Sequence, residues 1–295
     1  MPPKTELDRF AIGLMVILCM TWGLQQVAVK VASAGISPLW QAGLRSLGAA
    51  LLVWAWTGLR RIPLFERDAT LVPGIAAGAL FAAEFAFVYY GLQFTSASRG
   101  VIFLYTAPFF VALGARWLLP NESMRAAQWL GMALAFAGVL VLFGENLLRP
   151  AGQAWIGDLM MLVAAMFWAA TTLTVKASVL NRAAAEKTLL YQLGVSAPLL
   201  LLAAVALGEP GMFAPGVLVV ASLAFQTVMV AGISFLVWFW LVRQYPATRL
   251  SSFSFMTPVM GVLAGGLLLG EPLTPAVFAA LLLVGAGIWV ANRPA

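Results

Sequence analysis

The sequence predicts an all-α polytopic membrane protein with ten transmembrane helices, arranged as two inverted five-helix repeats around a central cavity. Three observations support this fold class: the composition, a series of apolar stretches of membrane-spanning length, and an internal repeat. The chain of 295 residues is 62% hydrophobic and 9% charged, whereas about a quarter of the residues in a soluble domain are charged. Such a chain cannot cover a water-facing surface of ordinary size, so lipid must be its main solvent.

Ten apolar stretches follow one another along the chain. A hydrocarbon core about 30 Å thick requires about 20 apolar residues per helix, and each stretch has roughly that length. Short segments with turn-forming residues, such as "SAGISP" and "GEPLTP", separate them. We therefore expect spans near residues 10–32, 38–58, 71–93, 98–119, 126–144, 156–178, 187–207, 217–242, 248–269 and 275–292.

The second part of the chain repeats the first. Pro108 aligns with Pro258 at an offset of 150 residues, and "WGLQQVAVK", which begins at Trp22, resembles "WAATTLTVK", which begins at Trp168. Further pairs fall on matching positions when one gap is allowed in a loop: Arg99 and Arg249, Glu122 and Glu271, and Glu84 and Ser234. The repeat predicts two halves, residues 1–147 and residues 148–295.

Each half contains an odd number of spans, so the second half should enter the membrane upside down relative to the first. Inverted repeats of this kind are typical of transporters that alternate access to a site near the membrane midplane. A duplicated membrane scaffold or membrane enzyme is the alternative, and the sequence shows no catalytic constellation that favours an enzyme.

The positive charges predict the orientation. Lys and Arg outnumber Asp and Glu by 17 to 11, and in membrane proteins such residues gather in cytoplasmic loops. With the N-terminus in the cytoplasm, only Arg99 and Arg149 face the outside, while Lys30 and Arg45 lie within spans. We therefore expect both termini to be cytoplasmic, and we do not expect a nucleic-acid partner.

The sequence also excludes several kinds of chemistry. It contains no histidine, which removes Ser-His catalytic triads and histidine-ligated metal sites. Cys19 is the only cysteine, so no disulfide can form within the chain. We expect a protein without enzymatic activity, cofactor or metal, whose partners are a small-molecule substrate and the lipid bilayer.

Several short motifs stand in a familiar order. They are the early "TWG", the P-x-x-x-x-L tracts that begin at Pro108 and Pro258, and the "GE" that ends at Glu271. With the five-plus-five spans, this order resembles the drug/metabolite transporter superfamily in its ten-helix EamA-like branch, and most closely the bacterial exporters of aromatic amino acids and paraquat. The fourth span departs from the pattern, since it ends in "PNE".

The resemblance has implications for the fold, the location and the chemistry. It implies a bacterial inner membrane and a central cavity that spans one to four and six to nine line, with spans five and ten packed behind them. It also implies transport without ATP and without covalent chemistry.

Two matching helix faces are candidates for the cavity wall. Trp22 and Gln26 lie four residues apart on one face of the first span, and Trp168 and Thr172 repeat this spacing in the sixth. Both Trp residues lie near the middle of their spans, whereas Trp that anchor a helix at the membrane interface lie at the ends. Lys30 and Lys176 continue the two faces, but so near the span ends that their side chains can instead extend to water.

Two charged residues lie within spans. Glu84 is in the middle of the third span, and Arg45 is in the first half of the second. A buried charge must face water, be paired or, for a carboxyl, be protonated, and it is rarely without a role. The sequence leaves two interpretations open for Glu84: it handles protons or cations, or it forms a structural pair with Arg45 or Lys30.

Aromatic residues and prolines complete the candidates. Tyr90, Tyr105 and Trp240 are candidates for the cavity wall, because aromatic walls suit planar or cationic solutes. Pro108 and Pro258 each remove a backbone hydrogen bond in the middle of a span. Their matched positions favour a functional bend, or hinge, over a static kink.

These candidates predict a secondary transporter that exports small metabolites, above all aromatic and other neutral amino acids, by alternating access. Trp22, Trp168, Tyr90 and Trp240 would hold the apolar part of the substrate, Arg45 or a lysine its carboxylate, and Glu84 its ammonium. One alternative is an exporter of viologen-type cationic drugs with Glu84 as the charge partner. Another is a nucleotide-sugar or phosphorylated-metabolite exchanger, which requires a basic cluster inside the cavity.

Overall fold

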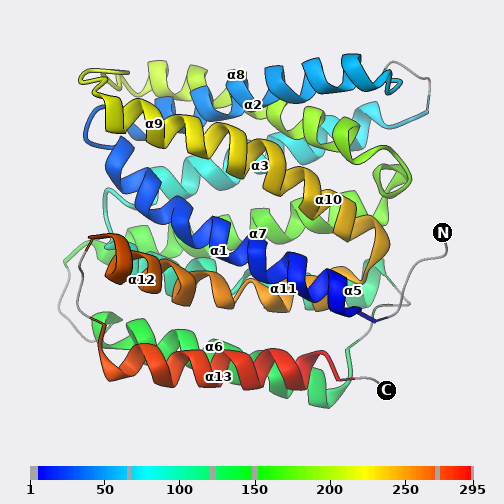
Figure 1. Cartoon of the computed structure of the whole chain (residues 1–295), viewed down its shortest axis with the longest axis vertical. Coiled ribbons are helices and arrows are strands. Elements are labelled where there is room, and N and C mark those ends of the chain that lie inside the picture. The colour runs from blue at the N-terminus through cyan, green and yellow to red at the C-terminus, as the bar shows by residue number, and fades with distance from the viewer. Residues whose placement is uncertain are drawn as a thin grey trace.

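The computed structural model describes residues 6–64, 68–119, 122, 124–147, 152–269 and 273–293. Within these residues the chain is helical, and its only extended pairing is an isolated bridge between Ile36 and Met212. The long helices lie side by side and cross the molecule in alternating directions, and both termini lie near the same end (Figure 1). The predicted all-α polytopic architecture is confirmed.

The helices follow the ten expected spans in order. The first half contains α1 (Arg9–Ala32), α2 (Pro38–Arg60), α3 (Leu71–Gly91), α4 (Ala97–Leu104) with α5 (Ala107–Leu118), α6 (Ala126–Phe143) and the short η2 (Gly144–Leu147). The second half contains α7 (Ala154–Ala177), the short η3 (Val179–Asn181), α8 (Ala185–Ala206), α9 (Val217–Phe225) with η4 (Gln226–Ser234) and α10 (Phe235–Gln244), α11 (Ala247–Phe253) with α12 (Met256–Leu269), and α13 (Pro275–Ala291).

Most of these spans are long and apolar enough to cross a bilayer. Among the described residues, eight helical stretches meet that criterion, and α13 is a shorter apolar helix. The remaining expected span is α2, which has 23 residues but contains Gln41, Arg45 and Ser46, all of them fully buried. Its polar residues therefore face the interior of the protein and not the lipid.

Three of the spans are interrupted. The fourth span breaks between Leu104 and Ala107, and the ninth breaks between Phe253 and Met256. A proline follows each break within the first turns of the next helix, where its missing N–H costs little: Pro108 in α5 and Pro258 in α12. The eighth span is interrupted differently, by the π-helix η4, which the sequence pattern did not predict.

Helices α6 and α13 pack against each other at one edge of the molecule (Figure 1). Glycines permit their close approach, because a Cβ on Gly131 would collide with the backbone of Ala291, and one on Gly287 would collide with Ala135. The two helices are the fifth and tenth spans, which were expected to lie behind the others.

The first helix of each half packs along the fourth span of the other half, and in the same direction. Cys19 of α1 contacts the carbonyl oxygen of Phe253 at 3.2 Å, and four residues later Gly23 packs against Gly261. In the corresponding place, α7 runs along α4 and α5. Since α1 and α5 cross the molecule in opposite directions (Figure 1), α7 runs opposite to α1, as an inverted repeat requires. The predicted boundary at residue 148 lies outside the described residues.

Candidate substrate cavity

A cavity of about 1030 Å³, a figure that includes its open mouth, lies between the two halves. The C-terminal parts of α1 and α3 line it, from Trp22 to Val29 and from Phe81 to Leu92. Both of these helices end on the side of the molecule opposite the termini (Figure 1), so the cavity extends from the middle toward that side. Its lining consists of Trp22, Gln25, Val29, Phe81, Glu84, Phe85, Val88, Tyr89, Leu92, Leu104, Tyr105, Trp168, Thr171, Thr172, Gln192, Phe235, Trp238 and Phe239.

Aromatic residues form half of the lining, and several of their rings pack edge to face against one another. The Trp22 ring meets the Trp238 ring with centroids 5.7 Å apart, and Tyr105 meets Trp168 at 5.9 Å. Trp22 Nε1 also donates a hydrogen bond of 2.9 Å to Ser234 Oγ, at the end of the π-helix η4. Contacts of this kind fix the ring planes before any substrate arrives.

Five of the nine predicted substrate-binding residues line this cavity: Trp22, Glu84, Tyr105, Trp168 and Thr172. The side chain of Gln26 lies outside what the structure describes, while its neighbour Gln25 lines the cavity. The break in the fourth span lies beside Leu104 and Tyr105, which line the cavity, whereas no described residue of the ninth span is among the lining residues.

Tyr90 and Trp240 do not line the cavity, which corrects the expectation. They are 41% and 37% exposed on the outside of the bundle, whereas the preceding residues Tyr89 and Phe239 line the cavity. Neighbouring helix positions point in directions about 100° apart, so an error of one residue moves a side chain from the cavity to the lipid. For Trp240, the preceding π-helix η4 also changes the register of α10.

Other cavity residues were missed by the sequence reasoning: Gln25, Phe81, Phe85, Thr171 and Gln192. Gln192 had one available signal, because the repeat places it near the position equivalent to Arg45. The phenylalanines had none, since Phe is equally common on lipid-facing surfaces of a membrane helix.

The two charged residues within the spans occupy different environments. Glu84 lines the cavity, while Arg45 is completely buried behind the wall. The guanidinium carbon of Arg45 lies 4.2 Å from the centre of the Phe85 ring. Within the described part of the chain, none of its three nitrogens has a hydrogen-bond partner. Arg45 therefore makes no hydrogen bond with Glu84, and a structural pair between these two residues, which was one interpretation, is not formed. The pairing of Glu84 with Lys30 stays a prediction.

A network closes the end of the molecule near the termini. Lys176, at the end of α7, donates hydrogen bonds to the carbonyl oxygens of Val242 (2.6 Å) and Tyr245 (2.8 Å). Its Nζ also lies 3.5 Å from Glu122, which accepts a bond of 2.7 Å from the amide of Ala247 at the start of α11. The expected extension of Lys176 to water does not occur. Burial raises the pKa of Glu122, and the neighbouring lysine partly offsets this effect.

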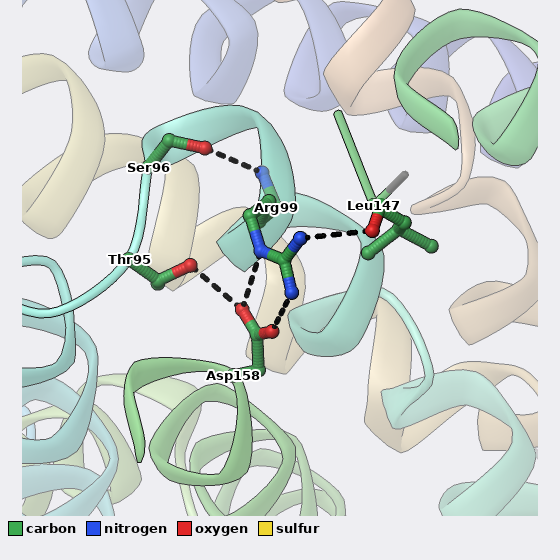
Figure 2. A network of polar contacts seen from close by, with 5 residues as sticks. All are labelled: Thr95, Ser96, Arg99, Leu147 and Asp158. Atoms are coloured by element: carbon green, nitrogen blue, oxygen red, sulfur yellow. Dashed lines mark hydrogen bonds and ion pairs between the residues drawn. The ribbon is translucent and has the colours of Figure 1, made fainter. Parts of the chain in front are cut away.

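A second network ties the opposite end, as Figure 2 shows. Asp158 in the second turn of α7 pairs with Arg99 of α4 and accepts a hydrogen bond of 2.6 Å from Thr95. Arg99 also donates to the carbonyl oxygen of Leu147 at 3.2 Å, and its amide is capped by Ser96. This network joins the two halves, because Thr95 and Arg99 belong to the first half and Asp158 to the second, and none of the three lines the cavity.

The cavity, the inverted halves and the paired helices can be compared with known proteins. The family model described as the EamA-like transporter family matches this chain twice, at residues 9–144 and 155–293. The chain belongs to the EamA-like transporter family. The two matches together cover nearly the whole chain, and each contains five of the ten spans.

Curated relatives of similar length agree with this EamA-like assignment. The chain is 30% identical to the uncharacterized transporter YvbV of Bacillus subtilis, over 98% of this chain and 92% of the relative. It is 28% identical to a probable amino-acid metabolite efflux pump of Salmonella typhimurium, over 94% and 93%. A solved crystal structure with 20% identity superimposes with a TM-score of 0.81 over 95% of both chains, which supports the fold. This EamA-like chain is thus a multi-pass membrane transporter.

Proposed function

We propose that the protein exports aromatic and other neutral amino acids across the bacterial inner membrane by alternating access. The observation that carries this proposal is the cavity itself, in which Glu84 is the one charged residue among the described lining residues and aromatic rings surround it. A carboxylate within aromatic walls suits a substrate with an ammonium group and a planar apolar part. The efflux pump in Salmonella typhimurium, named for amino-acid metabolites, adds support.

Each part of such a substrate has a partner in the cavity. Trp22 and Trp168 would hold the aromatic side chain, and Glu84 would hold the ammonium. Gln25, Thr171 and Thr172 offer hydrogen bonds to the remaining polar atoms. A neutral amino acid with a small side chain would use the same polar contacts and fill less of the aromatic wall, so it should bind more weakly.

The transport cycle would use the two inverted halves, residues 1–147 and 148–295. The breaks after Leu104 and Phe253, with Pro108 and Pro258 beside them, are proposed hinges. With both termini in the cytoplasm, as the positive charges predict, the cavity would open to the outside in this conformation. The Lys176–Glu122 network would then close its cytoplasmic end.

Proteoliposomes containing the purified protein test the function directly. Uptake of radiolabelled phenylalanine, with and without a pH gradient, should be saturable in the wild type. Trp168→Ala should reduce it about tenfold, since loss of one ring wall costs about 1–2 kcal/mol of binding. Trp117→Ala is the matched control, because Trp117 is 82% exposed and far from the lining. No phenylalanine uptake by the wild type, or equal uptake in both variants, would contradict the proposal.

A second candidate, the export of aromatic cations, is favoured by the same carboxylate. Glu84 and the aromatic rings would bind a viologen without any carboxylate partner. A viologen that competes with phenylalanine but is not itself moved would favour the amino-acid function. Exchange of phosphorylated metabolites lacks support, because no Lys or Arg is among the described lining residues.

A further inference from the structure

Arg45 is a buried charge that forms no hydrogen bond with any residue that the structure describes. It lies in the second turn of α2 and is 0% exposed. Its Nε and both terminal nitrogens make no hydrogen bond with any described residue. Burying a guanidinium in this way is costly unless an anion compensates it. An arginine with only a structural role is expected to donate at least one hydrogen bond within the protein.

The position of Arg45 shows from which side an anion can reach it. Its guanidinium lies against the face of Phe85, 4.2 Å from the ring centre, and the Phe85 ring is part of the cavity wall. Glu84, the residue before Phe85 in α3, and Tyr89, one turn further along, also line the cavity. The cation therefore lies one side chain behind the wall, at the level of the cavity carboxylate.

Polar groups without partners accompany Arg45 along the same helix. The next residue, Ser46, is fully buried, and its hydroxyl has no partner among the described residues. The π-helix η4 packs on α2, and there the amide of Gln226 is fully buried and lacks partners in the same way. Buried polar groups normally have hydrogen-bond partners, so Arg45 and these two side chains leave several unused donors in and against α2.

We propose that Arg45 binds the carboxylate of the amino-acid substrate and that the Phe85 ring is the movable partition between Arg45 and the cavity. This inference rests on the proposed function and specifies its substrate class as zwitterions. Glu84 takes the ammonium on the cavity side, and a turn of the Phe85 ring exposes the guanidinium fork, which suits a carboxylate. Without substrate, the ring covers Arg45 and stabilises it by the cation–π contact.

Three small molecules with the same phenyl group separate the two charges. Phenylalanine carries both, phenethylamine only the ammonium, and 3-phenylpropionate only the carboxylate. Competition against radiolabelled phenylalanine in proteoliposomes ranks their affinities. In the wild type, we expect phenylalanine to bind at least about tenfold more tightly than phenethylamine, because only phenylalanine has a carboxylate that can bind Arg45.

Arg45→Met should remove that preference. The affinity for phenylalanine should fall to that for phenethylamine, while the affinity for phenethylamine changes less than about twofold. Arg45→Lys keeps the charge but loses the two-pronged geometry and should be intermediate. Lys187→Met is the matched control, since Lys187 is a buried cation on α8 that pairs with Asp68 outside the cavity. An equal loss for both ligands in Arg45→Met, or no loss for either, would overturn the inference.

Chemical modification provides a test that needs no variant of Arg45. Phenylglyoxal reacts with accessible arginine, and mass spectrometry of the peptide that contains Arg45 reports the extent. Modification should be slow in the wild type, faster in Phe85→Ala, and blocked by phenylalanine but not by phenethylamine. Identical rates in all conditions would refute the partition. Wild-type protein that does not transport phenylalanine would instead refute the proposed function, so the two failures are distinguishable.

Discussion

The two ends of the molecule are built from equivalent sequence but are closed to different degrees. Each end has an arginine from the start of a fourth span that donates to the carbonyl following the last helix of its half. Arg99 binds Leu147 at one end, and Arg249 binds Asn292 at the other, both at 3.2 Å. At the end near the termini, Lys176 in addition joins α7 to the α10–α11 connection and to Glu122.

This comparison separates structural contacts from conformational ones. Contacts present at both ends, Arg99 with Leu147 and Arg249 with Asn292, each lie within one half and are expected to persist in any conformation. The Lys176 contact lies at the closed end, and its repeat counterpart Lys30 is exposed and directly follows Val29, which lines the cavity. Since inverted repeats can exchange their conformations, Lys30 and Glu271 are expected to take the role of Lys176 and Glu122 when the molecule opens to the other side. Glu271 lies outside the described residues.

The largest effect is expected at a structural contact. Asp158→Ala leaves Arg99 without its carboxylate where the two side chains are only 14% and 8% exposed. Removing one partner of a buried pair should destabilise the folded protein by about 2–4 kcal/mol. Cys19 is free and buried, so a thiol-reactive dye reports unfolding with temperature. The control is Asp68→Asn, because the Asp68 side chain is 31% exposed and the amide oxygen can still accept a hydrogen bond from Lys187, so the midpoint should shift much less. Equal shifts would show that the Arg99 network is not structural.

A smaller effect, on conformation and not on stability, is expected at Lys176. Lys176→Met removes two hydrogen bonds and the contact with Glu122 that close one end. A loss of about 1.5–3 kcal/mol of closing energy shifts the equilibrium between conformations about 10–100-fold. A single cysteine placed at Val29, in a Cys19→Ser background, should then be labelled about tenfold more slowly from the cavity side.

Arg243→Met provides the control for this measurement. Arg243 lies at the same end and donates to the carbonyl oxygen of Asn181 at 3.3 Å, but among the described residues it forms no hydrogen bond or ion pair with Glu122. Labelling at position 29 should be unchanged in this variant. If Lys176→Met leaves labelling unchanged as well, the Lys176 network is a static connection like that of Arg99.

Particular residues show which features of the fold and the cavity can be predicted from the sequence. Span positions and the Trp22 and Trp168 faces were predictable, because a lipid environment enforces helix length and the repeat gives each position twice. The choice between Tyr89 and Tyr90 was not, since in a nearly all-apolar span the hydrophobic pattern does not distinguish the cavity side from the lipid side. Glu122 was recognised only as part of the repeat, because a loop residue acquires its contacts from helices distant in sequence.

The smallest predicted effect concerns a difference between the halves inside the cavity. Glu84 and Ser234 occupy matching repeat positions, yet one is a charged wall residue and the other accepts the hydrogen bond of Trp22. Ser234→Ala removes that bond and should weaken phenylalanine binding about threefold to tenfold, corresponding to about 1 kcal/mol. The KM for uptake checks it, with Ser222→Ala on α9 as the control. Because Ser234 acts only through the orientation of Trp22, Ser234→Ala should have no further effect in a Trp22→Phe background. A full additional loss there would mean that Ser234 contacts the substrate itself.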